Sequence, residues 1–262
     1  MIQASVATAA VAFTQYPLSL FGGPEAEEGG VLIPFLNAQP AVKRQTRWAE
    51  LTDWVTRNED LYVVSHYNTP ELQAEDHTLD ISGLVGKPTR LGMEEIKSCP
   101  RKSVWATLEC GGNGASPGFM GAVGNIQWTG TPLSPLLESC QPLKRAIEIV
   151  FFGADTKLET IRKKEYTQNF ARSLHIADTR REDILLAYEF NGEPLSREHG
   201  APLRLVVPGW YGIAWVKWLH RIEVLDRRYM SKYMAREYVT LRGEERDGEK
   251  RRTPELGPGA KL

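Results

Sequence analysis

The sequence lacks an excess of charge of either sign, and it lacks any long hydrophobic run. Its 262 residues include 32 Lys and Arg against 33 Asp and Glu, which leaves a formal net charge of −1. Without a strongly basic surface or a nucleic-acid-binding motif, we expect no nucleic-acid partner and no electrostatic attachment to anionic lipids. No apolar stretch reaches the roughly 20 residues that a membrane-spanning helix needs. The length and the 42% hydrophobic content fit one large globular domain.

Cysteine is also scarce. The three cysteines, Cys99, Cys110 and Cys140, form neither a C-x-x-C pair nor a zinc-ligand spacing. Because three is an odd number, at least one thiol is free or bound to another group. A fold that depends on disulfides is not expected for a chain of this size.

Composition divides the chain into three parts: an N-terminal arm (residues 1–45), a folded domain (46–241) and a charged, mobile C-terminal tail (242–262) that cannot bury a core. The apolar stretch 4–13 is similar to the end of an export signal, although no basic segment precedes it. Two interpretations stay open. The stretch is either the remnant of an export signal, which would place the protein in the periplasm, or an apolar arm that packs on a cytoplasmic protein.

Apolar runs predict strands near residues 61–64, 79–81, 104–108, 147–152, 184–189, 203–207 and 222–225. Leu51, Trp54 and Val55 have helical spacing and predict a short amphipathic helix over residues 47–57. Ser134 and Pro135 predict a helix start, as an N-cap followed by a proline in the first turn. The polar segment 157–172 is predicted to be a surface loop. Periodicity alone therefore indicates mixed α and β content.

The most informative stretch is residues 103–130, in which an apolar run leads to Cys110 at the start of a glycine-rich loop. Gly111, Gly112 and Gly114 follow the thiol closely. Glycine has no side chain, so the backbone here leaves room for a large ligand beside the sulfur. The alternative is a buried structural cysteine before a tight turn, because free cysteine commonly packs as a small hydrophobic residue.

Four polar residues lie at strand ends or interrupt apolar runs. His66 ends a strand before a proline-bounded loop, and Asp155 follows a strand and a glycine. Each is a candidate site residue, with a hydrogen-bonded structural histidine and an Asx-turn as the alternatives. Arg204 interrupts an apolar strand five residues after His199. Because a buried arginine is costly without an anion, this pair indicates either an anion-binding site or an internal salt bridge.

Five stretches, in order, resemble the molybdenum-cofactor domain of the sulfite oxidase family. They are LECGGNG, GAVGNIQWTG, FFGAD, LLAYEFNGEPLSREHGAPLRLVVPGWYG and VKWL, and the match spans roughly residues 60–240. Each stretch is modest alone, but their order and spacing are specific. The resemblance implies an α+β fold with mixed sheets around a cofactor cleft, and a bound molybdenum–molybdopterin cofactor.

The resemblance also implies a role for individual residues. Cys110 matches the cysteine whose thiolate ligates molybdenum. Arg236 and Tyr238 match two residues of an Arg-Asp-Tyr active-site triplet, in which the tyrosine lies near an oxygen ligand of the metal. His199 and Arg204 match the pair that holds the phosphate-bearing end of the cofactor. The cofactor-binding positions are Tyr62, Val63, Val64, Ser65, His66, Asp155, His199, Arg204, Trp215, Val216 and Lys217.

The sequence departs from the family pattern at three positions. Val64 replaces the arginine of an Arg-Asn-His triplet, and Gly114 begins the stretch where the cysteine loop often carries arginines. Trp215 replaces a histidine that is common in the animal enzymes. A sulfite dianion needs cationic groups around it, so these departures bear on the substrate more than on the cofactor.

The resemblance implies a molybdenum-dependent oxidoreductase that oxidises sulfite or a related small sulfur anion by oxygen-atom transfer. Arg236, with Lys217 or Arg204, would supply the positive charge. The sequence has no C-x-x-C-H haem motif, so we expect an external electron acceptor, such as a c-type cytochrome. The alternatives are a molybdopterin-dependent reductase of sulfoxide-like or N-oxide-like groups and a truncated, non-catalytic remnant. We expect no immunoglobulin-like dimerisation domain after residue 241, which leaves the oligomeric state open.

Overall fold

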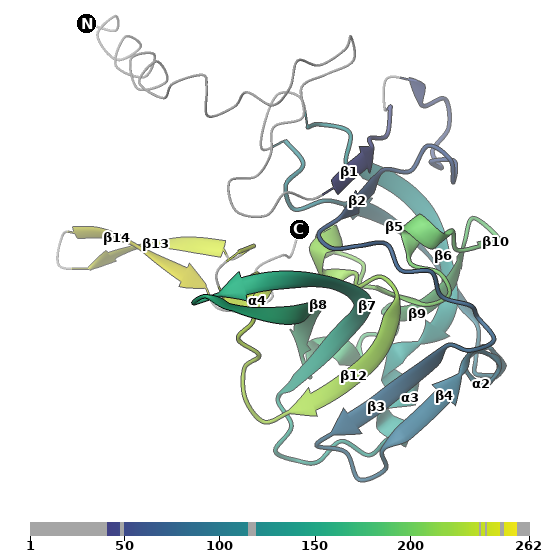
Figure 1. Ribbon diagram of the computed structural model, residues 1–262. Helices are drawn as coiled ribbons and strands as arrows, with labels where there is room; N and C mark the ends of the chain where they lie inside the picture. The colour runs from purple at the N-terminus through teal and green to yellow at the C-terminus, as the bar shows by residue number, and fades with distance from the viewer. Residues whose placement is uncertain are drawn as a thin grey trace, which may run out of the picture.

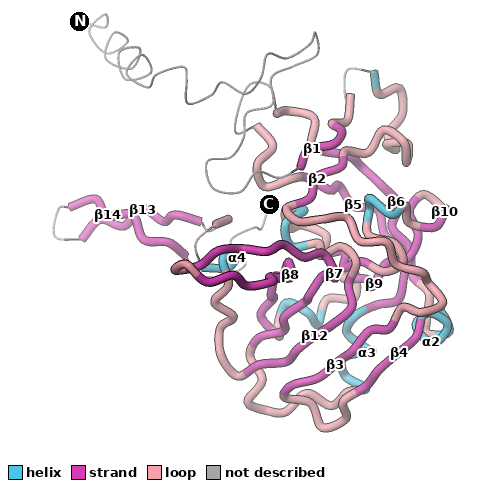
Figure 2. The backbone as a smooth tube through the Cα atoms, in the orientation of Figure 1, coloured by secondary structure: helices cyan, strands magenta, loops and turns pink. Residues whose placement is uncertain are grey.

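A computed structural model describes residues 41–47, 50–114, 119–235, 237–238, 240–246 and 249–255. Strands dominate the described part, and the helices are short (Figures 1 and 2). The predicted fold class of mixed sheets is thus confirmed, with less helix than the term α+β implies. The stretch interpreted as an export-signal remnant lies outside the described residues. No described helix has the length and apolarity needed to cross a membrane.

Strands outnumber helices along the described part of the chain. The strands are β1 Ala41–Arg44, β2 Val63–Ser65, β3 Thr78–Gly83, β4 Thr89–Gly92, β5 Lys102–Glu109, β6 Val123–Pro132, β7 Glu148–Ile161, β8 Lys164–His175, β9 Leu185–Phe190, β10 Glu193–Pro194, β11 Arg204–Val206, β12 Leu219–Leu225, β13 Thr240–Arg246 and β14 Glu249–Glu255. The α-helices are α2 Met93–Ser98, α3 Leu133–Ser139 and α4 Lys232–Ala235, and the 3₁₀ helices are η3 Asp178–Arg180, η4 Arg197–His199 and η5 Gly212–Ala214.

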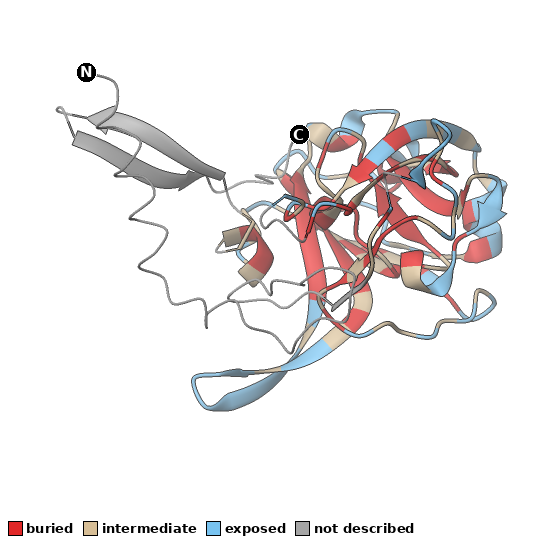
Figure 3. Ribbon diagram, turned by 90° about the horizontal axis from the view of Figure 1, so that it is seen from above, coloured by how far each residue is buried: buried red, intermediate tan, exposed pale blue. Residues whose placement is uncertain are grey.

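Two larger sheets carry the core (Figure 1). One has the strand order β10-β9-β6-β5, with β11 paired to β9, and the other has the order β4-β3-β12-β7-β8. The pairings are antiparallel except that of β12 with β3, which is parallel. Residues of both sheets, among them Trp128 and Phe151, join one buried apolar cluster, seen as the red interior in Figure 3. The predicted strands are confirmed, because each predicted segment overlaps a strand of the structure.

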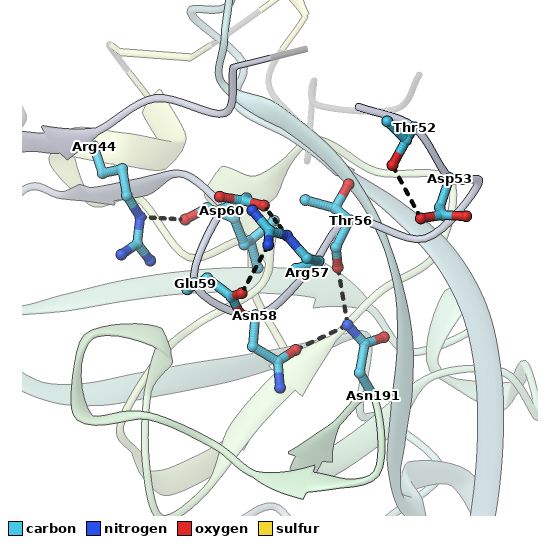
Figure 4. Close-up of polar contacts among 10 residues, drawn as sticks. Arg44, Thr52, Asp53, Thr56, Arg57, Asn58, Glu59, Asp60 and Asn191 are labelled. Atoms are coloured by element: carbon cyan, nitrogen blue, oxygen red, sulfur yellow. Dashed lines mark hydrogen bonds and ion pairs between the residues drawn. The ribbon is translucent and has the colours of Figure 1, made fainter. Parts of the chain in front are cut away.

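Segment 47–57 does not form the predicted helix in its described residues. Leu51 and Trp54, which gave the helical spacing, are exposed, Trp54 by 82%. The backbone instead bonds to residues outside the segment. Thr56 N donates to Asn125 O of β6 at 2.8 Å. Asn191 Nδ2, in the turn between β9 and β10, donates to Thr56 O at 2.9 Å (Figure 4). These partners replace the i to i−4 bonds of a helix, so the apolar spacing here is not a core-facing pattern.

The predicted surface loop 157–172 is also wrong, because β7 and β8 form a long antiparallel hairpin there. Its turn residues, Arg162 and Lys163, have φ of 51° and 66°. Such a turn usually carries Asn or Gly, so its sequence gives no turn signal. The distal half of the hairpin is exposed and projects from the domain in Figure 3, whereas its base is buried. Residues of the predicted C-terminal tail take part in a second antiparallel hairpin, β13 with β14.

The backbones of β6 and β9 approach each other closely at Gly130. A Cβ atom added at Gly130 would lie 2.1 Å from Leu186 O and 2.6 Å from Ala187 Cα, next to a register shift. Backbone atoms cannot rotate away, so we expect Gly130→Ala to lower the free energy of unfolding by about 3 kcal/mol. Gly92→Ala is the control, because a Cβ there meets only a side-chain oxygen at 3.7 Å. Equal losses for the two variants in urea denaturation would contradict this account.

Candidate active site

One pocket gathers most of the residues singled out from the sequence. It encloses about 650 Å³ that no protein atom fills, part of which is open solvent, a size typical of small-ligand sites. Both larger sheets and the loops beside them contribute to its wall. The lining residues are Tyr62, Val63, Val64, Ser65, His66, Leu108, Cys110, Asp155, Phe170, Glu198, His199, Arg204, Gly212, Ile213, Trp215, Lys217, Trp218 and Tyr238.

Cys110 lies directly after β5, and Asn113 fixes its loop. The Asn113 side chain donates to Glu109 Oε1 at 3.1 Å and accepts from Ala122 N at 3.0 Å, while Cys110 N donates to Ala122 O. Burial raises the pKa of the Cys110 thiol, and backbone N–H groups of Gly112 and Asn113 partly oppose this by bonding to the sulfur. The sulfur is therefore a buried neutral thiol whose surroundings already hold donors for a thiolate.

Tyr238 covers the other side of this loop. A Cβ built on Gly111 would lie 3.3 Å from Tyr238 Cδ1, so the ring packs on a backbone that has no side chain in the way. The residue adopts a φ of 57°, an unfavourable conformation for tyrosine that is held by its surroundings. His66 packs against the edge of the Tyr238 ring at 5.4 Å and stacks on Phe170 at 5.7 Å. Burial, followed by the charge of Lys217, lowers the pKa of His66 to about 3, so this imidazole is neutral.

Arg204 is a buried cation that binds carbonyl groups rather than a carboxylate. It is 2% exposed and lies over the Trp128 ring at 4.7 Å. Its Nη1 donates to His199 O at 2.9 Å and its Nη2 to Trp215 O at 3.3 Å, whereas Nε has no partner among the described residues. The alternative of an internal salt bridge thus finds no partner in the described part of the chain. An uncompensated buried guanidinium that lines a pocket favours an anionic ligand.

His199 is closely tied to its neighbours. Its Nδ1 lies 2.7 Å from Ser196 Oγ and its Nε2 lies 3.3 Å from Tyr62 O. Because the carbonyl can only accept, Nε2 carries the proton and Nδ1 accepts from the hydroxyl. Burial and the nearby Arg204 charge lower the pKa of His199 to about 3. The ring is therefore a neutral group that positions the backbone carbonyl bonded to Arg204.

Asp155 lies in β7 and Lys217 lies in the loop that leads into β12, and both line the pocket. Asp155 lies within the irregularity of β7 between Phe152 and Thr156 and is 3% exposed, and its Oδ1 has no partner among the described residues. Burial raises the pKa of Asp155 to about 7, although the Lys217 charge partly opposes the shift. A buried carboxylate oxygen without a donor fits a ligand that brings N–H groups.

Lys217 holds the pocket wall together. Its Nζ donates to Val64 O, Ser65 Oγ and Glu198 O at 2.9, 2.8 and 2.9 Å. We expect Lys217→Met to lower the free energy of unfolding by about 3 kcal/mol, because three part-buried acceptors lose their shared donor. Lys102→Met is the control, since that ammonium pairs at 3.5 Å with the exposed Glu182 and should change stability by less than about 1 kcal/mol. Similar losses of unfolding free energy for the two variants in urea denaturation would contradict the role of Lys217 in holding the pocket wall together.

Of the predicted site residues that the structure describes, Val216 does not line the pocket. Val216 is fully buried, and its carbonyl accepts from Leu205 N, so it supports β11 instead. Arg236 lies outside the described residues. The remaining predicted residues, from Tyr62 to Tyr238, are brought together from positions far apart in the sequence.

Phe170 and Arg172 on β8 are absent from the predicted site. Phe170 lines the pocket, and Arg172, two residues further on the same face, is 1% exposed. None of the three guanidinium nitrogens of Arg172 has a hydrogen-bond partner among the described residues. The signal in the sequence is the alternation of Phe170, Arg172 and Leu174, which is typical of one strand face. It is obscured by the polar segment that precedes it.

A family model and several known proteins match the part of the chain that forms most of the pocket. The family described as "Oxidoreductase molybdopterin binding domain" matches residues 66–233. Mitochondrial sulfite oxidase of Drosophila melanogaster is 38% identical over 199 residues, covering 70% of this chain and 33% of that protein. Sulfite oxidase of Arabidopsis thaliana is 31% identical over 221 residues, covering 78% and 55%. Inducible nitrate reductase [NADH] 2 of Glycine max is 36% identical over 187 residues, covering 66% and 21%.

Among solved structures, the sulfane dehydrogenase SoxCD from Paracoccus pantotrophus aligns with a TM-score of 0.66 at 30% identity, over 78% of this chain and 51% of that one. This chain thus spans between about a fifth and about half of the length of the proteins it matches. The family match covers well over half of the chain and includes most of the pocket wall. The chain belongs to the sulfite oxidase family of molybdopterin-binding oxidoreductase domains.

Proposed function

We propose that this chain is the cofactor domain of a molybdenum-dependent enzyme that oxidises sulfite or a related small sulfur anion. The observation that carries the proposal is the convergence on one pocket of Cys110, Tyr238 and buried polar groups that lack partners among the described residues, Asp155 Oδ1 and Arg204 Nε. Two sulfite oxidases and a sulfane dehydrogenase among the similar proteins support the sulfur chemistry.

The pocket fits the molybdenum cofactor that the family binds. Asp155 would accept hydrogen bonds from the amino groups of the pterin, and Arg204 would bind its phosphate-bearing end. Cys110 would supply a thiolate, the soft ligand that suits the metal. When bound, the cofactor supplies the two-electron redox chemistry and the oxygen-atom transfer. These unsatisfied buried groups argue against a cofactor-free remnant, because such a protein would keep their cost without a ligand.

The chain's own residues orient the reaction. The tyrosine ring of Tyr238, packed on Gly111, encloses the space beside Cys110, and burial raises the pKa of its hydroxyl. The group therefore stays protonated and can donate a hydrogen bond to an oxyanion. His66, neutral and stacked against Tyr233 at 4.9 Å, closes the wall and contributes no charge. Arg236 lies outside the described residues, and its role as a source of positive charge at the site stays a proposal.

A reductase of sulfoxide-like or N-oxide-like groups is the second candidate. Val64 and Gly114 stand where the family pattern often has arginines, and a neutral substrate needs fewer cations. Proteins named nitrate reductases are among the similar proteins. Reduced-viologen oxidation with a panel of sulfoxides and N-oxides tests this candidate directly.

The proposed function is tested by expressing the chain with a supply of molybdenum cofactor, measuring molybdenum by elemental analysis, and assaying sulfite-dependent reduction of ferricyanide. Sulfite and water give sulfate, protons and two electrons, so two ferricyanide ions are reduced for each sulfite consumed. We expect stoichiometric molybdenum and activity at that ratio. Molybdenum-loaded protein that reduces sulfoxides but does not oxidise sulfite would replace the first candidate with the second.

The electron acceptor and the location are further proposals. We propose an external acceptor, a c-type cytochrome, because the sequence has no C-x-x-C-H haem motif. A periplasmic location is motivated by the apolar stretch 4–13. Cytochrome c reduction by the loaded protein, and fractionation of cells that express the full-length chain, test these two proposals separately.

A further inference from the structure

Arg172 is a fully buried cation without an anion. It is 1% exposed, no ion pair involves it among the described residues, and Nε, Nη1 and Nη2 all lack hydrogen-bond partners there. Arginine carries five donors, and leaving them unsatisfied in the interior is costly. Burial lowers its pKa only to about 10, so the side chain stays charged at neutral pH. An anion that binds the guanidinium would offset this cost.

Arg172 is not itself a lining residue, but it lies directly beside the pocket wall. It pairs with Phe151 of β7 and shares a strand face with Phe170, which lines the pocket. Its charge contributes to lowering the pKa values of two pocket residues, Tyr238 and His66. Cys110, the proposed metal ligand, in turn raises the pKa of Tyr238, and Tyr238 packs on Gly111 next to that cysteine. The guanidinium therefore lies on the Tyr238 side, whereas Arg204 lies over Trp128 on the side proposed for the phosphate.

Lys217 and Arg204, the Lys and Arg side chains among the described lining residues, already have hydrogen-bond partners. Lys217 Nζ donates to three acceptors of the wall, and Arg204 donates to two backbone carbonyls. Neither meets the need for positive charge that the departures at Val64 and Gly114 leave. Of these two cations and Arg172 beside the wall, Arg172 has the most nitrogens without a partner among the described residues.

We propose that Arg172 is the cation of the substrate subsite, which binds an oxyanion such as sulfite beside Tyr238. The inference rests on the proposed function and deepens it. It assigns the positive charge to β8, a part of the chain different from the two positions where the family often has arginines. The preferred substrates are then small oxyanions that accept hydrogen bonds from a planar guanidinium.

The test uses the molybdenum-loaded protein, in which the cofactor would be held by Arg204. We expect Arg172→Met to raise KM for sulfite by about 30-fold or more, with a smaller change in kcat and unchanged molybdenum content. Arg172→Lys should recover part of the loss, because it keeps the charge but not the fork of donors. Arg221→Met is the matched control: it removes the same charge from the same sheet, and its guanidinium lies 3.5 Å over Phe152, on the opposite face from Phe151.

A second readout does not depend on turnover. Sulfate, a non-reacting oxyanion, should raise the melting temperature of the wild type and of Arg221→Met, but not of Arg172→Met. Loss of molybdenum in Arg172→Met would overturn the inference, because the residue would then serve the cofactor. An equal sulfate response in all variants would overturn it as well. A wild type that fails to oxidise sulfite yet shows the Arg172-dependent sulfate response refutes the proposed substrate and leaves the anion subsite standing.

Discussion

Cys110→Ser is expected to lower sulfite-dependent ferricyanide reduction by more than about a hundredfold and to reduce the molybdenum content. Replacing a residue that only hydrogen-bonds to a metal ligand commonly costs about 10- to 100-fold, so loss of the ligand itself should cost at least as much. Serine is close to cysteine in size, but its hydroxyl does not ionise near neutral pH and is a hard ligand. The N–H groups of Gly112 and Asn113 that bond to the sulfur would then face an uncharged oxygen.

Cys140→Ser is the matched control for this substitution. Cys140 is 0% exposed, and its thiol contacts Thr89 Oγ1 at 3.6 Å and Leu136 O at 3.4 Å, away from the pocket. The same sulfur-to-oxygen change there should cost some stability and leave both molybdenum content and activity intact. If the two variants lose activity equally, or if Cys110→Ser retains full activity with full molybdenum, Cys110 is the structural cysteine of the alternative interpretation.

The pocket was largely predictable from the sequence because its residues lie in short, ordered motifs. Cys110, Asp155 and Arg204 each follow or interrupt an apolar run, so local patterns mark them even before any resemblance is considered. The strands that carry them were predicted for the same reason. Local patterns do not show which strands pair with each other. For example, β12 lies parallel to β3, although more than a hundred residues separate them.

Arg172 was missed for a specific physical reason. The hairpin β7–β8 extends beyond the core, so its distal strands are exposed on both faces and show no apolar alternation. Its turn uses Arg162 and Lys163 at positive φ, where Asn and Gly are the usual signals. The opposite error occurred at Leu51 and Trp54, whose helical spacing reflects no buried face. Periodicity detects a strand or a helix only where one face meets the core.

The second large effect is expected for Asp155→Asn, and its sign depends on the cofactor. In the cofactor-free protein the pKa of Asp155 rises from its ordinary 3.8 to about 7 because the carboxyl is buried. The folded state thus binds this proton more tightly than the unfolded state does, and stability falls as the pH rises between these two values. The full penalty, about 4 kcal/mol above pH 7, disappears in the asparagine variant.

We therefore expect cofactor-free Asp155→Asn to be more stable than the wild type in urea denaturation at pH 8, by up to about 4 kcal/mol, and equal to it at pH 4. Asp80→Asn is the control of opposite sign, because the hydrogen bond from Arg90 lowers the pKa of Asp80; it should lose a little stability above pH 4. In the cofactor-loaded protein the wild type should instead be more stable than Asp155→Asn. An amide offers one acceptor oxygen and no charge to the amino groups of the pterin, so the variant should release the cofactor faster. A variant that is stabilised with and without cofactor would show that Asp155 does not contact it, because only a ligand that donates to the carboxylate can turn the cost of burying it into a gain.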